Sequence, residues 1–268
     1  LIAVGGGITQ DVAAFIASLL YRGVEWLFFP TNVLTQCDSC IGSKTSINFK
    51  EYKNQLGGFY PPSAVYIDTS FVTTLGEREI ASGLGEMLHY FLVSSEADLN
   101  LFWEHAPKLR KGEGTLAPLM HRSLAIKKAM IEIDEFDQGP RNVFNYGHSF
   151  GHALESATDY AIPHGTAVSY GIDLANLVSV HLGLLPMAER NRIRPACEVV
   201  FKGAPLPEVD IERYFSALSK DKKNEGSQLG LILTRGAGDM FKQLCDFDDG
   251  IKQVIETYFT KELYLSDQ

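Results

Sequence analysis

The order of apolar segments at the start of the chain constrains its fold more than any other feature. "LIAVGGG" is typical of a buried strand that runs into a glycine turn, and "TQDVAAFIASLLYRG" then has helical spacing, with Gly23 just past its end. "VEWLFFP" and "AVYID" predict two further strands. Strand, glycine turn, helix and strand form the βαβ pattern of a parallel sheet that binds nucleotide phosphates. "GGGITQD" lacks the full G-x-G-x-x-G fingerprint, so on its own it indicates phosphate binding only weakly.

After residue 75 the pattern becomes helical. "EREIASGLGEMLHYFLVS", "LAPLMHRSLAIKKAMIEI", "RNVFNYGHSFGHALESA" and "GTAVSYGIDLANLVSVHLGLL" have helical periodicity, and only "LGLILT" in this half looks like a strand. We therefore expect an α/β part with a partial Rossmann-like parallel sheet over residues 1–75, followed by a mostly α-helical domain over residues 76–268. The chain opens inside an apolar run with Leu1, which suggests that it begins part-way through a larger polypeptide.

Composition excludes several classes of partner. The 268 residues carry a formal net charge of −9, which argues against nucleic acid or an anionic membrane surface as the main partner. No apolar run reaches the roughly 18 residues of a spanning helix, and no signal peptide is present, so we expect a cytoplasmic protein. Cys37 and Cys40 form a C-x-x-C pair without a second such pair, and we expect reduced, buried thiols.

Histidines cluster in "NYGHSFGHALESATDYAIPHG", at His148, His152 and His164. The first two are four residues apart and share one helix face, so they are either metal ligands, catalytic groups or packing residues. A zinc site needs a third ligand and an open position for chemistry. "GLGEMLHY" offers Glu86, three residues before His89. Glu86, His148 and His164 would make a Glu-His-His site with room for a substrate oxygen.

These motifs carry a family resemblance. "GGGITQD", "PTNVLTQCDSCIGSKTSIN", "KNQLGGFYPP", "GLGEMLHY", "DEFDQGPRNVFNYGHSFGHALE", "HGTAVSYGI" and "DKKNEG" occur in the order and spacing seen in 3-dehydroquinate synthases, over nearly the whole chain. The chain resembles this family of sugar-phosphate cyclases, which is related in fold to iron-containing alcohol dehydrogenases. The resemblance implies an N-terminal NAD domain, within which this chain begins, and a C-terminal helical metal domain.

The resemblance also implies site residues. It makes Glu86, His148 and His164 the ligands of zinc, cobalt or another divalent metal, with His152 beside the metal as an active-site group. Further catalytic positions are Lys127, Asn145, Asp38 and His89. The substrate-binding positions are Arg141, Asn54, Lys44, Lys223 and Arg22. The NAD-binding positions are Gly7, Ile8, Thr9, Gln10, Asp11, Thr31, Asn32, Lys44, Lys53, Phe71, Val72, Thr73 and Thr74.

The implied reaction forms a carbocycle from a seven-carbon sugar acid phosphate, 3-deoxy-D-arabino-heptulosonate 7-phosphate. NAD oxidises a metal-bound secondary alcohol, phosphate leaves by elimination, NADH returns the hydride, and an aldol step closes the ring. An arginine fork suits the substrate carboxylate. The family forms a homodimer, in which the arginine that matches Arg22 reaches the neighbouring subunit's substrate.

Three positions depart from the family pattern. His89 stands where the family usually has lysine, Gln10 replaces a glycine and Asn32 replaces a threonine. Because histidine titrates near neutrality, we expect His89 to alter substrate choice or activity.

Other functions remain open. His89 favours another sugar-phosphate cyclase of a specialised carbohydrate pathway, acting on sedoheptulose 7-phosphate or a similar substrate. A metal-dependent polyol dehydrogenase of the same fold would not need the cationic residues, and a non-catalytic paralogue would not need the metal triad.

Overall fold

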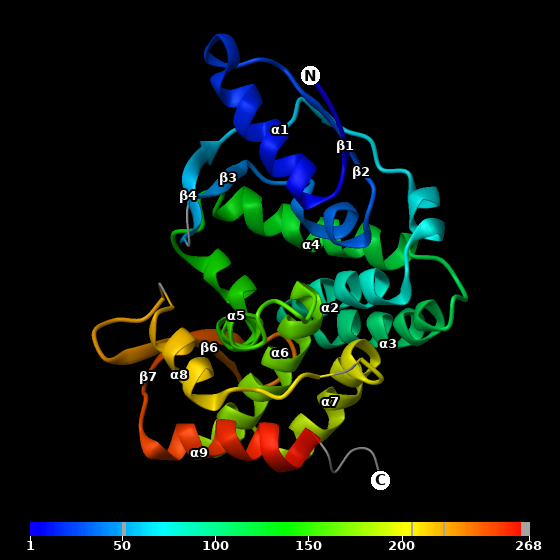
Figure 1. The fold of residues 1–268 in the computed structure, drawn as a ribbon. Helices are drawn as coiled ribbons and strands as arrows, with labels where there is room; N and C mark the ends of the chain where they lie inside the picture. The colour runs from blue at the N-terminus through cyan, green and yellow to red at the C-terminus, as the bar shows by residue number, and fades with distance from the viewer. Residues whose placement is uncertain (50–51, 205, 222, 264–268) are drawn as a thin grey trace.

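The structure is a computed structural model that describes residues 1–49, 52–204, 206–221 and 223–263. The side chains of residues 48, 49 and 52–54 are not described. Figure 1 shows α1 with β1 and β2 at one end of the molecule and α9 with β6 and β7 at the other, with the remaining helices between them.

The first part of the chain forms a parallel sheet of three strands in the order β1-β2-β5. Ile2 of β1 (Ile2–Gly5) pairs with Leu27 of β2 (Leu27–Pro30), and Leu27 pairs with Ala64 of β5 (Ala64–Val65). Helix α1 (Gly7–Leu19) is the crossover between β1 and β2, and Ala17 on it is buried against Trp26 and Phe28. The predicted βαβ pattern is therefore confirmed, with a shorter third strand than "AVYID" indicated.

An antiparallel hairpin of β3 (Lys44–Phe49) and β4 (Tyr52–Phe59) follows β2 and was not predicted. Its strands are rich in polar residues and glycine, which weakens the apolar alternation of a strand. Gly57 is required by the pairing, because a Cβ there would lie 1.9 Å from the Thr45 carbonyl oxygen.

Helices make up most of the chain beyond residue 76, as predicted. Their bounds are Glu77–Ser94 for α2, Glu96–Arg110 for α3, Ala117–Ile133 for α4, His148–Ala157 for α5, His164–His181 for α6, Met187–Phe201 for α7, Ile211–Ser219 for α8 and Asp249–Thr257 for α9. The expectation of a single strand in this half was wrong, because β6 (Gln228–Thr234) pairs with β7 (Met240–Asp246). The second strand carries Lys242, Gln243 and Asp246 and so lacks the continuous apolar run of the first. The division at residues 75 and 76 into two domains stays a prediction.

Helix α6 is the centre of this half, since every residue from Gly165 to Ser179 is buried. It packs directly on α2, where a Cβ on Gly165 would lie 1.7 Å from the Ser82 carbonyl oxygen and a Cβ on Gly85 1.9 Å from the Gly165 carbonyl oxygen. Glycines at this crossing thus bring the two backbones together.

The structure divides one predicted helix into two separate elements. The stretch 141–157 reads as a single periodic segment, but a 3₁₀ segment (Pro140–Asn145) ends before α5 begins at His148. Gly147 between them has φ 79°, and a Cβ there would meet Ile172 and the Val168 carbonyl oxygen. This turn decides the direction in which His148 leaves the backbone.

Candidate active site

Three helices bring the predicted metal ligands together. Glu86 lies in α2, His148 is the first residue of α5, and His164 is the first residue of α6. Glu86 Oε1 lies 3.5 Å from His148 Nε2, and Glu86 Oε2 lies 3.4 Å from His164 Nε2. The three side chains each offer one atom within 4.8 Å of the others. Their convergence depends on the close α2–α6 contact.

The donor set fits a divalent metal. Ligands about 2.0–2.2 Å from a tetrahedral ion lie about 3.3–3.6 Å from one another, which is the separation between Glu86 and each histidine. Glu86 Oε2 is buried and accepts no hydrogen bond from any described residue. Burial by itself raises the pKa of Glu86. The adjacent His148 and His164 lower it by more than burial raises it, so the pKa of this carboxyl lies well below its usual range. A buried carboxylate beside two imidazoles, with one oxygen that accepts no hydrogen bond, is suited to bind a cation.

Neighbouring groups orient both imidazoles. His148 Nδ1 lies 3.2 Å from the Tyr146 carbonyl oxygen, which directs Nε2 toward Glu86. His164 Nδ1 lies 3.4 Å from Glu155 Oε1 on the opposite side of the ring from Glu86. Burial lowers the pKa of His164, but the two carboxylates outweigh it and raise the pKa to about 10. A carboxylate behind a ligating histidine fixes its tautomer and strengthens it as a ligand.

His152 lies beside the triad. Its ring centroid is 5.5 Å from those of both His148 and His164. His152, Glu155 and His164 form a second group of potential ligands, which shares His164 with the first. Because Glu86 lies next to Nε2 of His164 and Glu155 next to Nδ1, an ion held at Nε2 leaves Nδ1 to donate to Glu155.

A cavity of about 380 Å³ opens next to Glu86 and His148, where the α/β part meets the helical half. It brings together predicted cofactor, substrate and catalytic positions that are far apart in the sequence. Its predicted members are Gln10, Asp11, Asp38, Lys44, Glu86, His89, Lys127, Arg141, Asn145 and His148.

The charges in this cavity are partly paired. Lys127 Nζ lies 2.7 Å from Asp38 Oδ1 and donates to the Asp38 carbonyl oxygen, and Tyr90 donates its hydroxyl to the same carboxylate. Lys44 Nζ lies 2.8 Å from Asp137 Oδ2. Arg141 is 8% exposed and donates to the Glu135 carbonyl oxygen, but its guanidinium has no carboxylate partner among the described residues. Arg141 is therefore a buried cation with donors to spare for an anion.

His89 is buried to 1% exposure, and neither ring nitrogen has a hydrogen-bond partner among the residues described. Burial lowers its pKa to about 3, against the opposing effect of Glu86. The expectation that His89 titrates near neutrality was therefore wrong, since its ring is neutral throughout that range.

Five of the predicted cofactor positions, Gly7 to Asp11, form the start of α1. Gly6 precedes the helix without a side-chain cap, which leaves N–H groups free for a phosphate. Gln10 Nε2 donates to the Ser39 carbonyl oxygen, and the Ser39 hydroxyl donates to Gln10 Oε1. Asn32 Oδ1 accepts from the Thr35 backbone N–H. Ile8 is 84% exposed. Phe71, Val72, Thr73 and Thr74 lie in a 3₁₀ segment (Thr69–Thr74), apart from the residues that line the cavity.

Lys223 and Arg22 are not among the residues that line the cavity. Lys223 pairs with Asp221 at 2.9 Å, and Arg22 is exposed with φ 68°. The side chains of Lys53 and Asn54 lie outside the described part of the chain.

Sequence reasoning missed Tyr90, Glu155 and Asp137. Tyr90 follows His89 directly, and Glu155 lies three residues after His152 on the same helix, a spacing that could have indicated it. Asp137 faces Lys44 only because a distant loop lies against β3. Among the described residues, no helix is long and apolar enough to cross a membrane. The four cysteines are buried free thiols.

Comparison with known proteins supports the resemblance. Residues 1–82 match a family model described as 3-dehydroquinate synthase N-terminal, and residues 83–224 match 3-dehydroquinate synthase C-terminal. The 3-dehydroquinate synthase of Syntrophotalea carbinolica is 35% identical over 260 residues, which cover 94% of this chain and 72% of the relative.

Solved structures of two cyclases are also similar. The 2-epi-5-epi-valiolone synthase from Streptomyces hygroscopicus subsp. jinggangensis, with NAD⁺ and Zn²⁺ bound, has a TM-score of 0.85 and 28% identity, covering 97% of this chain and 73% of its own. A 2-deoxy-scyllo-inosose synthase has a TM-score of 0.83 and 25% identity, covering 95% of this chain and 71% of its own.

Proposed function

The chain belongs to the 3-dehydroquinate synthase family of lyase-type cyclases, and from this premise we propose that it converts 3-deoxy-D-arabino-heptulosonate 7-phosphate into a carbocycle with loss of phosphate. The observation that carries the proposal is Arg141, a buried cation without a carboxylate partner among the described residues, in the same cavity as Glu86 and His148. A guanidinium in that position suits the carboxylate that this substrate carries.

Glu86, His148 and His164 would hold the divalent metal, and the start of α1 would hold the NAD pyrophosphate. When bound, the metal lowers the pKa of a substrate hydroxyl, and NAD accepts and later returns a hydride. The solved valiolone synthase with NAD⁺ and Zn²⁺ supports this pair of cofactors.

The other lining residues act on the substrate's charges and protons. Lys44 is half exposed, so its ammonium can exchange Asp137 for the substrate phosphate. The Asp38–Lys127 pair and Asn145 would hydrogen-bond the sugar hydroxyls, and His152, beside the triad, would relay a proton. Roles for Lys53, Asn54 and Lys223 in binding, and for Arg22 across a homodimer, remain part of the proposal.

A second candidate substrate is a neutral sugar phosphate such as sedoheptulose 7-phosphate. The observation that favours it is His89, an uncharged side chain where the family usually has lysine. The structural similarity to a 2-deoxy-scyllo-inosose synthase and a 2-epi-5-epi-valiolone synthase supports it as well.

Phosphate release from each substrate, with NAD and Zn²⁺ supplied, tests the proposal. We expect turnover of the acid phosphate and a loss of most of that activity in Arg141→Ala, because removing one partner of a buried charged pair costs about 2–5 kcal/mol. Lys128→Ala is the matched control. Lys128 follows Lys127 in the sequence, but it is an exposed cation and pairs with Glu132. Turnover of sedoheptulose 7-phosphate alone would reject the acid substrate, and equal activity of Arg141→Ala would reject the role of Arg141.

A further inference from the structure

His164 lies between two carboxylates that belong to different helices. Glu86 Oε2 lies 3.4 Å from His164 Nε2, and Glu155 Oε1 lies 3.4 Å from His164 Nδ1. Glu86 is in α2 and belongs to the candidate metal triad, whereas Glu155 is in α5 and is not a member of that triad. Because a neutral imidazole can coordinate an ion through either nitrogen, the ring can serve an ion on either side.

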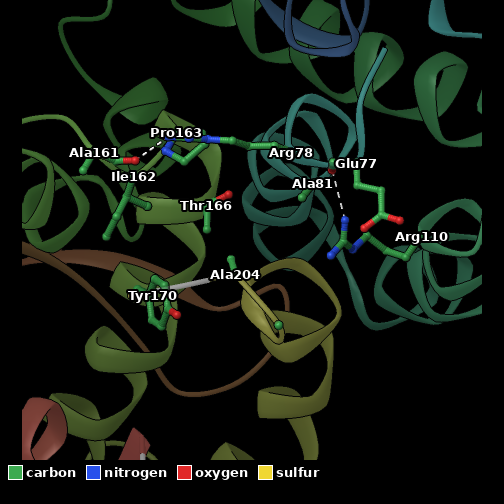
Figure 2. Close-up of a pocket in the computed structure, with 11 residues that line it drawn as sticks. Glu77, Arg78, Ala81, Arg110, Ala161, Ile162, Pro163, Thr166, Tyr170 and Ala204 are labelled. Carbon is green, nitrogen blue, oxygen red and sulfur yellow. Dashed lines mark hydrogen bonds between the residues drawn. The ribbon is translucent and has the colours of Figure 1, made fainter. Parts of the chain in front are cut away.

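The backbone on both sides of His164 is fixed against α2. Figure 2 shows Arg78 of α2 donating a hydrogen bond to the Ala161 carbonyl oxygen, just before His164 in the sequence. The backbone N–H of Gly165, the next residue after His164, donates to Ser82 Oγ at 3.1 Å. These contacts hold the start of α6 in place, so the His164 ring stays between the two carboxylates.

Glu155 is one of three potential ligands on its side of the ring. His152, Glu155 and His164 each offer one atom within 4.8 Å of the others. His152 and Glu155 are three residues apart on α5, a spacing that directs both side chains to one face of the helix. A carboxylate and a histidine at this spacing supply metal ligands in di-iron helical bundles. Two histidines and one carboxylate are also ligand types that Zn²⁺ and Co²⁺ accept.

The Glu155 carboxylate provides a second, independent indication of an ion. The residue is 5% exposed, and its Oε2 atom accepts no hydrogen bond from any described residue. A buried carboxylate oxygen without a partner is costly. An ion bound between Glu155 and His164 Nδ1 would satisfy this oxygen.

This group is separate from the substrate cavity. His152 is exposed, and none of the three residues lines the cavity of about 380 Å³ that reaches Glu86 and His148. An exposed ligand must be immobilised when an ion binds, and water screens its interaction with the ion. We therefore expect weaker binding here than at the triad, by about a thousandfold.

We propose that His152, Glu155 and Nδ1 of His164 form a second site for a divalent transition-metal ion such as Zn²⁺ or Co²⁺. A neutral imidazole has one free lone pair, so an ion on Nδ1 and an ion on Nε2 exclude one another while the ring stays neutral. The ion therefore occupies the triad when the triad is intact and the second site when it is not. No residue that lines the substrate cavity is a ligand of the second site, so an ion there is catalytically silent. The proposal concerns ion binding alone and does not depend on which substrate is turned over.

Titration of His148→Ala with Co²⁺ tests the second site, because this variant lacks one ligand of the triad and none of the second group. We expect saturable binding of one ion per chain, about a thousandfold weaker than in the unaltered chain, measured by the visible absorption of the bound cobalt. Adding His152→Ala to this variant should abolish the binding, whereas adding Glu86→Gln should leave it unchanged. In the unaltered chain, His152→Ala should keep the tightly bound ion, since the triad is complete.

Matched controls separate loss of a ligand from general damage to the fold. His121→Ala is the control for His152→Ala, because His121 is also an exposed histidine on a helix. Glu155→Gln repeats the test at another ligand, with Asp159→Asn, an exposed carboxylate just after the same helix, as its control. The melting temperature of each variant shows whether it is folded.

The combined variants decide where the weakly bound ion lies. Binding in His148→Ala that survives the addition of His152→Ala would overturn the proposal. Binding that is lost on adding Glu86→Gln would do the same, because the ion would then lie in what remains of the triad. Absence of saturable binding in His148→Ala at millimolar Co²⁺ would also overturn it.

Discussion

At the scale of single residues, burial and neighbouring charges together decide the protonation of the groups in and around the candidate metal triad. His89 and Glu86 are both buried, yet burial lowers the pKa of His89 to about 3 while adjacent imidazoles keep Glu86 ionised. A neutral ring and a charged carboxylate therefore lie 4.0 Å apart. This arrangement leaves the negative charge available to a cation.

Glu155 is predicted to tune the metal site through His164. Because its carboxylate lies 3.4 Å from His164 Nδ1, Glu155→Gln should weaken zinc binding by about ten- to hundredfold. Competition with a chromophoric chelator measures this affinity directly. Asp159→Asn, an exposed carboxylate just after the same helix, should leave the affinity unchanged. Equal affinity in Glu155→Gln would show that Glu155 does not act on the ligand.

The Asp98–Arg122 pair is predicted to make stability depend on pH. Burial raises the pKa of Asp98, but hydrogen bonds from Arg122 at 2.6 and 2.8 Å, together with those from Ser94 and Ser95, lower it overall. A carboxyl group whose pKa is lower in the folded than in the unfolded chain stabilises the folded state at pH values above its unfolded pKa, near 4. This stabilisation is lost as the pH falls through the folded-state pKa.

Arg122→Ala should therefore lower the free energy of unfolding by about 1 kcal/mol at pH 7, at the low end for a charged hydrogen bond because the Arg122 side chain is 44% exposed. The difference from the unaltered chain should shrink toward pH 2. Urea unfolding at both pH values measures it. A difference that is the same at pH 7 and pH 2 would mean that Arg122 stabilises through packing alone.

At the scale of elements, the α2–α6 crossing positions the site. Glu86 in α2 and His164 at the start of α6 can face one another because glycines remove the side chains between the two backbones. Helical periodicity predicted both helices, but no local pattern indicates which two helices approach this closely. The close approach is seen only in the three-dimensional distances between backbone atoms around Gly85 and Gly165.

Gly165→Ala should disrupt this crossing. Its Cβ would lie 1.7 Å from the Ser82 carbonyl oxygen, so the helices must separate, and we expect a loss of more than about 2 kcal/mol of stability. The variant should also bind zinc less tightly, because His164 precedes the substitution. Chemical denaturation and chelator competition report the two effects. Gly58→Ala, where no atom lies within 4 Å of an added Cβ, should change stability by less than about 0.5 kcal/mol. Similar effects of the two substitutions would contradict the close approach.

At the scale of the whole molecule, the candidate metal site joins α2, α5 and α6. A ligand that binds only the folded chain stabilises it by mass action, by about 2.7 kcal/mol at a concentration one hundred times its dissociation constant. Zinc should therefore raise the melting temperature by about 5–10 °C, and a chelator should reverse the rise.

His148→Ala should abolish this thermal shift, whereas His121→Ala should keep it, since His121 is an exposed residue of α4. Scanning calorimetry with and without zinc is the measurement. If His148→Ala kept the full shift, the stabilising ion would be bound elsewhere.

Local patterns in the sequence determined the βαβ start, the periodicity of most helices and the motifs that carry the family resemblance, because strand, helix and glycine turn depend on neighbours a few residues away. They did not reveal the β3–β4 hairpin, whose strands have little apolar alternation, or the turn at Gly147 that divides one periodic stretch into two elements.

Only the tertiary structure decided the electrostatics of the site. Lys127 meets Asp38, 89 residues away, Lys44 meets Asp137, and Arg141 is left without a carboxylate partner among the described residues. His89 is neutral near pH 7 because it is buried, and a one-dimensional pattern cannot show that burial. Charge pairing and desolvation act between atoms brought together by folding, so residue types alone indicate candidate groups, and the packing of α2, α4 and α6 sets their charge and their partners.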